Sequence, residues 1–207
     1  MISVIWEEDP RYLTSVRLTM ICSGATRATR HGAFPLDEPL EPRSVAMAES
    51  MRQGLRRADR TWTSPALRAR QTAGALALPA TVQPLLADHD HGDWAGRTFA
   101  DVQAEEGDAL AVWLADPNAA PHGGEPLSGL LLRAATFMNE LVQLPGHTIA
   151  VTHAAMIRAA MLHVLGAPWQ SYRKIDIEPL SMVDFRSDGG RWTLRAGSHR
   201  TGAGARV

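Results

Sequence analysis

The feature that most constrains the fold is an alternation of short apolar strand patterns with longer amphipathic helix patterns. Three apolar runs predict buried strands, at 17–21, 61–63 and 148–152. Helical spacing of apolar residues predicts helices over 42–55, 66–76, 128–142 and 154–165. Two further strand patterns around a Gly-rich turn predict a closing hairpin over 182–195. This alternation predicts a three-layer α/β/α sandwich around a mostly parallel sheet, with functional groups at the carboxyl ends of the strands.

Length and composition exclude several classes of protein. The 207 residues, 45% of them hydrophobic, fit one domain over 1–207, with an N-terminal extension (1–16) and a flexible tail (197–207). A net charge of −1 provides no global field for nucleic acid or an acidic membrane surface, so any anion site must be local. Neither a signal peptide nor a membrane span is recognisable, and one cysteine excludes an internal disulfide. We expect a soluble, cytoplasmic protein without nucleic acid or membrane partners. A monomer and a homodimer are both compatible with the sequence.

Two strand ends carry side chains suited to binding an anion. His153 follows the strand pattern 148–152 and begins a helix, where a phosphoryl group can bind. Arg68 lies early in the helix that follows Ser64, the expected N-cap residue, and a guanidinium there can hold an oxyanion. The alternatives are a core histidine bonded to a carbonyl and a solvated surface arginine.

Several segments, in chain order between Leu18 and Gly166, together resemble the histidine phosphatase (phosphoglycerate mutase-like) superfamily. The matching segments are Ser64-Pro-Ala-Leu-Arg68-Ala-Arg-Gln-Thr72 (S-P-x-x-R-A-x-Q-T), Asp88 with Gly92, Trp94 and Gly96 (E-x-x-x-G-x-W-x-G), His122-Gly-Gly-Glu125 with the downstream Arg133 (G-G-E-S and R), and Val151-Thr-His153-Ala-Ala-Met-Ile-Arg158 (V-S-H-G-G-x-I-R). The resemblance implies that Arg68 and His153 hold phosphate, and that Asp88 is the proton donor.

The first motif departs from the family pattern. Members carry R-H-G-x-T after the first strand, whereas this chain has Cys22-Ser23-Gly24-Ala25-Thr26. In the family the histidine of that motif takes the phosphoryl group covalently. A serine hydroxyl would need an adjacent base to replace it. The resemblance therefore implies that ordinary phosphohistidine turnover is absent.

The strand ends and the family motifs together define a candidate site. The catalytic candidates are Ser23, Asp88 and His153; the substrate-binding candidates are Cys22, Gly24, Thr26, Arg68 and Glu125. We expect an enzyme that handles a small phosphorylated or anionic molecule by altered or weak chemistry, without cofactor or metal. The alternative is a non-catalytic relative that binds such a ligand or a protein partner. Two segments, 98–126 and 167–178, are the expected lids, but their aromatic residues give no specificity code.

Three other motifs offer competing interpretations. Arg30-His31-Gly32 has the residues of the family's R-H-G motif. His31, however, falls in the loop after the strand and not at its end. Cys22 could be a thiolate nucleophile, but only four residues separate it from Arg27 where that chemistry needs five, so a small apolar role is favoured. A metal site around His89 and His91 lacks a second set of ligands, which favours a polar loop.

Overall fold

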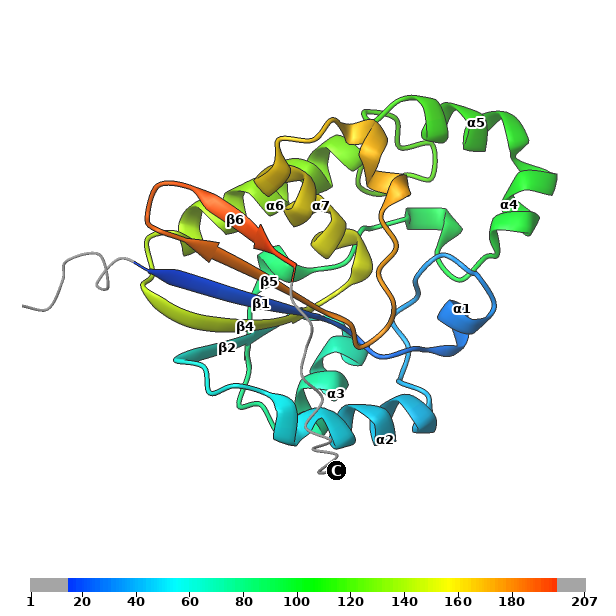
Figure 1. Ribbon diagram of the computed structural model, residues 1–207. Coiled ribbons are helices and arrows are strands. Elements are labelled where there is room, and N and C mark those ends of the chain that lie inside the picture. Colours follow the sequence, from blue (N-terminus) through cyan, green and yellow to red (C-terminus); the bar gives the residue numbers. More distant parts are fainter. Residues whose placement is uncertain (1–14, 197–207) are drawn as a thin grey trace, which may run out of the picture.

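A computed structural model describes residues 15–196, and its centre is one six-stranded sheet (Figure 1). The strands are β1 (Val16–Cys22), β2 (Arg60–Thr63), β3 (Thr81–Val82), β4 (Gly146–Thr152), β5 (Met182–Ser187) and β6 (Trp192–Arg195). Their order is β3-β2-β4-β1-β5-β6. The first four are parallel, whereas β5 runs antiparallel to β1 and β6 antiparallel to β5. The predicted mostly parallel sheet and closing hairpin are confirmed.

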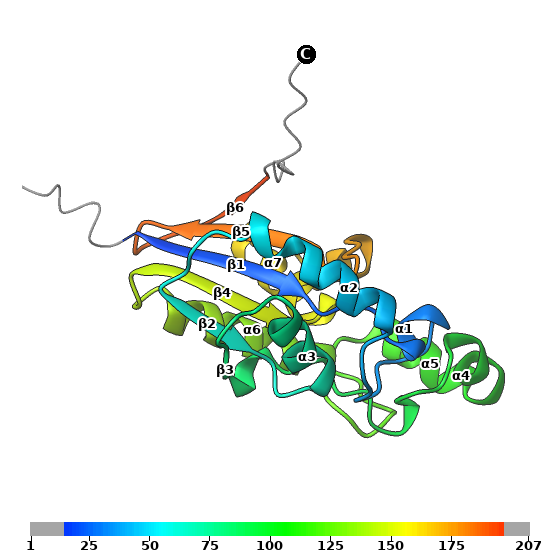
Figure 2. The same ribbon diagram turned by 90° about the horizontal axis from the view of Figure 1, so that it is seen from below.

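Helices cover both faces of the sheet (Figure 2). They are α1 (Arg27–Arg30), α2 (Pro42–Met51), α3 (Leu67–Ala75), α4 (Phe99–Glu105), α5 (Gly107–Ala115), α6 (Leu127–Leu141) and α7 (Ala154–Leu165), with 3-10 turns η2 (Arg52–Gly54), η3 (Pro84–Leu86), η4 (Gly92–Trp94) and η5 (Trp169–Lys174). Successive side chains of β1 point to opposite faces. Met20 therefore packs with α6 and α7, while Ile21 packs with α2 and α3. The predicted three-layer sandwich is confirmed.

Beyond the carboxyl ends of the parallel strands lies a lobe formed by α4 and α5 (Figure 1). Its small core includes Phe34, Val102 and Leu110 around the fully buried Trp94. The Trp94 Nε1–H donates to the Glu106 carboxylate at 2.9 Å. This lobe covers the sheet edge where the site was expected.

Some predicted boundaries are wrong for identifiable reasons. Helix α2 stops at Met51 and continues as a 3-10 turn up to Gly54, a residue that disfavours a helix interior. Ser64 is not an N-cap, because α3 begins at Leu67 after Ala66 and the Ser64 hydroxyl contacts His153 instead. Val16, assigned to the extension, starts β1. The rest of the predicted extension, apart from Ser15, and the tail from 197 lie outside the described residues. Within residues 15–196, no helix is both long and apolar enough to cross a membrane.

Candidate active site

A cavity of about 550 Å³ opens at the carboxyl ends of β1 and β4, beneath the α4–α5 lobe. It is lined by seven of the eight predicted site residues: Cys22, Ser23, Gly24, Thr26, Arg68, Asp88 and His153. Glu125 does not line it. Parallel strands bring these residues together because β1 and β4 end side by side, with Cys22 paired to Thr152.

His153 is the central side chain of the cavity. It is the N-cap residue of α7, but its side chain makes no capping bond. The ring nitrogens instead face the cavity floor: Nε2 lies 2.7 Å from the Ser64 hydroxyl, while Nδ1 lies 3.4 Å from the Ser23 hydroxyl and 3.6 Å from an Asp88 carboxylate oxygen. Burial lowers the pKa of His153 to about 4, against the attraction of Asp88. The ring is therefore neutral at pH 7.

Asp88 and Arg68 form a buried ion pair next to His153. Arg68 Nη2 donates to Asp88 Oδ2 at 2.5 Å, and the two side chains are only 8% and 14% exposed. Burial alone would raise the pKa of Asp88, but the attraction of His153 and Arg68 lowers it below its usual value. Asp88 is thus a carboxylate at neutral pH, and must gain a proton before it can protonate a leaving group.

The end of β1 is fixed by its backbone. The Ser23 N–H donates to Thr152 O at 2.7 Å, and the Cys22 N–H donates to Ser181 O at 3.0 Å. The Gly24 N–H donates to the Thr72 hydroxyl at 3.0 Å. Thr26 caps α1 by accepting from the Thr29 N–H. These bonds fix the backbone at Ser23, whose hydroxyl faces His153 Nδ1 at 3.4 Å.

Cys22 is buried beside this floor, and its thiol is unsuited to nucleophilic attack. Burial and the nearby Asp88 carboxylate raise its pKa to about 12. At pH 8 only about one thiol in 10⁴ is ionised.

We predict that Cys22 resists iodoacetamide at pH 8 in the folded protein and is alkylated once urea unfolds it. Mass spectrometry reads the result cleanly because the chain has a single cysteine. The Cys22→Ser variant should keep whatever turnover the wild type shows. Fast alkylation of the folded protein, or loss of turnover in this variant, would revive the thiolate mechanism.

Glu125 lies outside the cavity and stabilises the site through Arg133. Its carboxylate accepts from Arg133 Nε at 3.0 Å and from Arg133 Nη2 at 2.7 Å. The same guanidinium donates to the carbonyls of Leu85, Ala87 and Asp88. The pair therefore holds the segment that carries Asp88.

Two glycines allow the loop after Asp88 to pack against the segment that carries Glu125. Gly92 has φ of +47°, and a Cβ there would lie 2.0 Å from His122 O. A Cβ on Gly124 would lie 2.3 Å from Asp90 O. Both positions therefore exclude any side chain.

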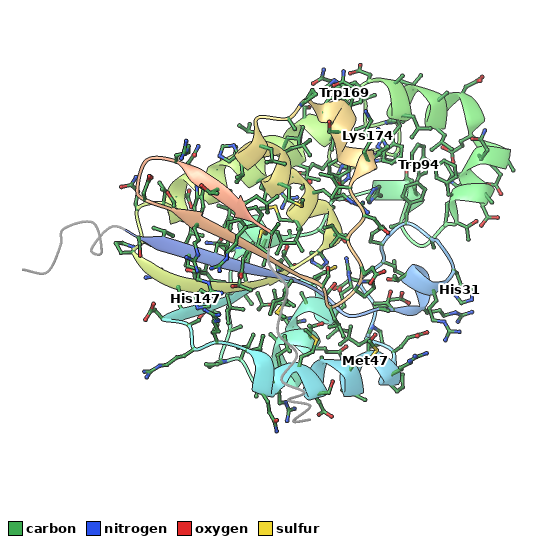
Figure 3. All side chains as sticks on the ribbon, viewed as in Figure 1. His31, Met47, Trp94, His147, Trp169 and Lys174 are labelled. Atoms are coloured by element: carbon green, nitrogen blue, oxygen red, sulfur yellow. The ribbon has the colours of Figure 1, made fainter. Side chains whose placement is uncertain are left out.

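His31 lies away from the cavity, whereas His89 and His91 line it. His31 is exposed at the end of α1 (Figure 3) and does not line the cavity. Its Nδ1 contacts Arg27 O at 2.7 Å. His89 and His91 do line the cavity, with ring centroids 4.4 Å apart. Among residues 15–196, however, no group of three or more His, Cys, Asp or Glu side chains is placed to hold a metal ion.

Several residues in or next to the cavity were not predicted from the sequence. Ser64 binds His153, and the only signal for it was its place in the S-P segment. Arg158, Tyr172 and Arg173 line one wall. Arg158 stood in a recognised motif without an assigned role, and Arg173 belongs to a lid segment whose fold was not predictable.

The fold and the cavity together define a phosphoglycerate mutase-like α/β protein with a His-Arg-carboxylate site at the carboxyl ends of its strands. Residues 18–198 match the histidine phosphatase superfamily (branch 1), and the chain belongs to that superfamily.

Among curated proteins, the chain is 26% identical to an adenosylcobalamin/alpha-ribazole phosphatase of Salmonella typhimurium, over 86% of this chain and 89% of that protein. It is 33% identical over 135 residues to a bifunctional protein of Mycobacterium tuberculosis, covering 61% of this chain but only 37% of the relative. The chain thus spans little more than a third of that relative. Among solved structures, mycobacterial glucosyl-3-phosphoglycerate phosphatase with VO3 aligns with a TM-score of 0.76 at 26% identity, over 86% of this chain and 96% of that one.

Proposed function

We propose that this protein binds a small phosphorylated or otherwise anionic metabolite in the cavity and hydrolyses it at most slowly, because Ser23 stands where the superfamily carries its nucleophilic histidine. The observation that carries the proposal is the meeting of Ser23, His153, Asp88 and Arg68 on one cavity floor. Relatives named as phosphatases of alpha-ribazole and glucosyl-3-phosphoglycerate compounds support a phosphorylated ligand.

The hydrogen bonds around His153 favour anion binding over activation of Ser23. The Ser64 hydroxyl oxygen accepts from the Ala66 N–H at 3.2 Å, so its own proton is free to point to His153 Nε2. We infer that the neutral ring carries its proton on Nδ1, beside the Asp88 carboxylate. A protonated Nδ1 donates to an anion but cannot take the proton of the Ser23 hydroxyl. Ser23 therefore lacks the adjacent base that a serine nucleophile needs.

The start of α7 adds a second reason to expect an anion here. Ala154 and Ala155 line the cavity, and the first N–H groups of a helix have no partner within it. The residues that carry these groups line one cavity together with His153 and Arg68, and the Ala154 N–H also bonds to Cys22. Together they supply neutral and charged donors to the oxygens of a phosphoryl group.

We predict that phosphate or vanadate stabilises the wild-type protein. One site at about 100-fold its Kd contributes about 2.7 kcal/mol, which raises Tm by about 5–10 °C for a chain of this size. His153→Asn, which keeps a favourable N-cap residue, should abolish the shift, whereas His31→Ala should leave it intact. Differential scanning calorimetry against anion concentration gives the measurement.

A single-turnover assay with 4-nitrophenyl phosphate distinguishes slow hydrolysis from binding alone. Stabilisation without turnover makes the protein a binding module. Absence of stabilisation by either anion contradicts the proposed site, and fast wild-type turnover that is lost in His31→Ala contradicts the assignment of Ser23.

A further inference from the structure

The cavity is larger than a phosphoryl group needs, and one of its walls differs in chemistry from the floor. A volume of about 550 Å³ is typical of a pocket that holds a whole small metabolite. Phe34, His91, Phe99 and Trp113 line the wall next to the α4–α5 lobe, which we call the aromatic wall. The ring centroids of Phe34 and Trp113 lie 4.9 Å and 6.0 Å from that of His91. A ligand that extends beyond its phosphoryl group can therefore meet aromatic rings and one imidazole.

The backbone fixes the tautomer of His91. Its Nδ1 lies 3.0 Å from the carbonyl oxygen of His89, and a carbonyl oxygen only accepts hydrogen bonds, so Nδ1 carries the proton. Burial and the neighbouring His89 and His122 lower the pKa of His91 to about 4, against the attraction of Asp88. The ring therefore has no second proton at pH 7, and its Nε2 is a hydrogen-bond acceptor.

This acceptor is unpaired and accessible. Within residues 15–196, His91 Nε2 forms no hydrogen bond, whereas Nδ1 does. The buried side-chain nitrogens and oxygens without a partner in this part of the chain are Arg17 Nε, Trp113 Nε1 and His122 Nε2. His91 Nε2 is not one of these enclosed atoms, so it keeps an accessible surface, and His91 lines the cavity. The aromatic wall thus presents one free acceptor to a ligand.

A phosphoryl group cannot pair with this atom. Its ionised oxygens accept hydrogen bonds, as His91 Nε2 does, so the phosphoryl group belongs on the floor with His153 and Arg68. The partner of Nε2 must be a donor elsewhere in the ligand. A neutral donor suits the aromatic wall better than an ammonium group, because none of the four side chains of the wall is an anion that could compensate a buried charge.

We propose that His91 is a specificity-determining residue, whose Nε2 accepts a hydrogen bond from a hydroxyl group in the part of the ligand remote from the phosphate. The rings of Phe34 and Trp113 pack against the carbon atoms that carry this hydroxyl. The ligand is then a phosphate ester with at least one further free hydroxyl. This inference deepens the proposed function and rests on it.

Three series of phosphonates test the inference, because their P–C bond is not hydrolysed. Isothermal titration calorimetry compares ω-hydroxyalkyl, alkyl and ω-methoxyalkyl phosphonates at matched chain lengths. A methoxy oxygen accepts hydrogen bonds but donates none. At the length that reaches His91, we expect the hydroxyl compound to bind wild type about fivefold more tightly than either of the others, the effect of one neutral hydrogen bond.

A substitution at position 91 assigns this gain to the imidazole. His91→Phe keeps an aromatic ring but removes the acceptor, so the gain from the hydroxyl should vanish while alkylphosphonates bind as they do to wild type. His91→Leu gives the same comparison if His91→Phe does not fold. His31→Phe, at the exposed end of α1 (Figure 3), is the matched control and should keep the gain.

The outcomes separate this inference from the proposal on which it rests. If alkylphosphonates bind but a hydroxyl adds nothing at any length, or a methoxy group adds as much, the role of His91 is overturned and the floor site stands. A gain from the hydroxyl that persists without the imidazole overturns that role as well, because another atom then accepts the bond. Failure of every phosphonate to bind overturns the proposed function itself.

Discussion

Replacing Ser23 by histidine should raise the turnover of 4-nitrophenyl phosphate by about 100-fold, equivalent to about 2.7 kcal/mol of barrier. The introduced imidazole would stand at the end of β1, facing His153 and within the volume that Arg68 lines. Its nitrogen would attack phosphorus while the P–O bond to nitrophenolate breaks. Water would then release phosphate from the imidazole. The measurement is kcat/KM by stopped-flow absorbance on purified wild type and Ser23→His.

The control for this gain is Ser23→Asn, which places a side chain of similar polarity at the same position without a nucleophilic nitrogen. It should remain as slow as the wild type. An equal gain in both variants would show that bulk or polarity at residue 23 matters and that the imidazole does not. No gain in Ser23→His, in a protein that still binds phosphate, would count against position 23 as the nucleophile's place.

Removing Arg68 should cost about 3 kcal/mol of folding free energy, because it leaves the Asp88 carboxylate buried without its guanidinium partner. The cost depends on pH with a definite sign. In the wild type the pKa of Asp88 is lowered, so the stabilisation is present above about pH 4 and is lost as the pH falls through the folded-state pKa. In Arg68→Ala the burial that raises the pKa of Asp88 is opposed by His153 but no longer by Arg68, so this pKa rises above its wild-type value and protonation relieves part of the penalty. The stability difference should therefore shrink between pH 7 and pH 4.5 in urea unfolding.

Two further variants separate the contribution of the Arg68–Asp88 ion pair from other effects of replacing Arg68. Arg70→Ala, an exposed position on the same helix, should change stability by less than about 0.5 kcal/mol. Arg68→Ala combined with Asp88→Asn should recover most of the loss, since no buried charge is then left unpaired. An Arg68→Ala protein as stable as Arg70→Ala would mean that the ion pair contributes little in solution.

The layered fold was predictable because its strands and helices have distinct periods. β1 and β4 are buried along most of their lengths, and α7 ends at Leu165 before Gly166, which takes the left-handed conformation expected of a C-terminal glycine. The site was predictable where residues follow strands directly, as Ser23 and His153 do. Parallel topology then places both at one edge of the sheet.

The features that were not predicted from the sequence depend on contacts between distant segments. Glu125 was placed in the binding site because its motif matches, but it holds Arg133 and the backbone around Asp88. Ser64 looked like a helix cap because Pro65 follows it, yet its hydroxyl contacts a histidine 89 positions away. The cavity wall lined by Arg158, Tyr172 and Arg173 forms only when η5 packs against α7, and no local pattern of residues 167–178 indicates that packing.

The proposed function depends most on Ser23 occupying the nucleophile's position, and trapping the phosphoenzyme tests this most directly. Wild type and Ser23→His are mixed with 4-nitrophenyl phosphate, quenched in alkali, in which phosphohistidine survives, and analysed by peptide mass spectrometry. We predict a phosphohistidine at position 23 of the variant and none on any histidine of the wild type. A phosphohistidine in the wild-type protein, at His31, His153 or any other histidine, would contradict the account.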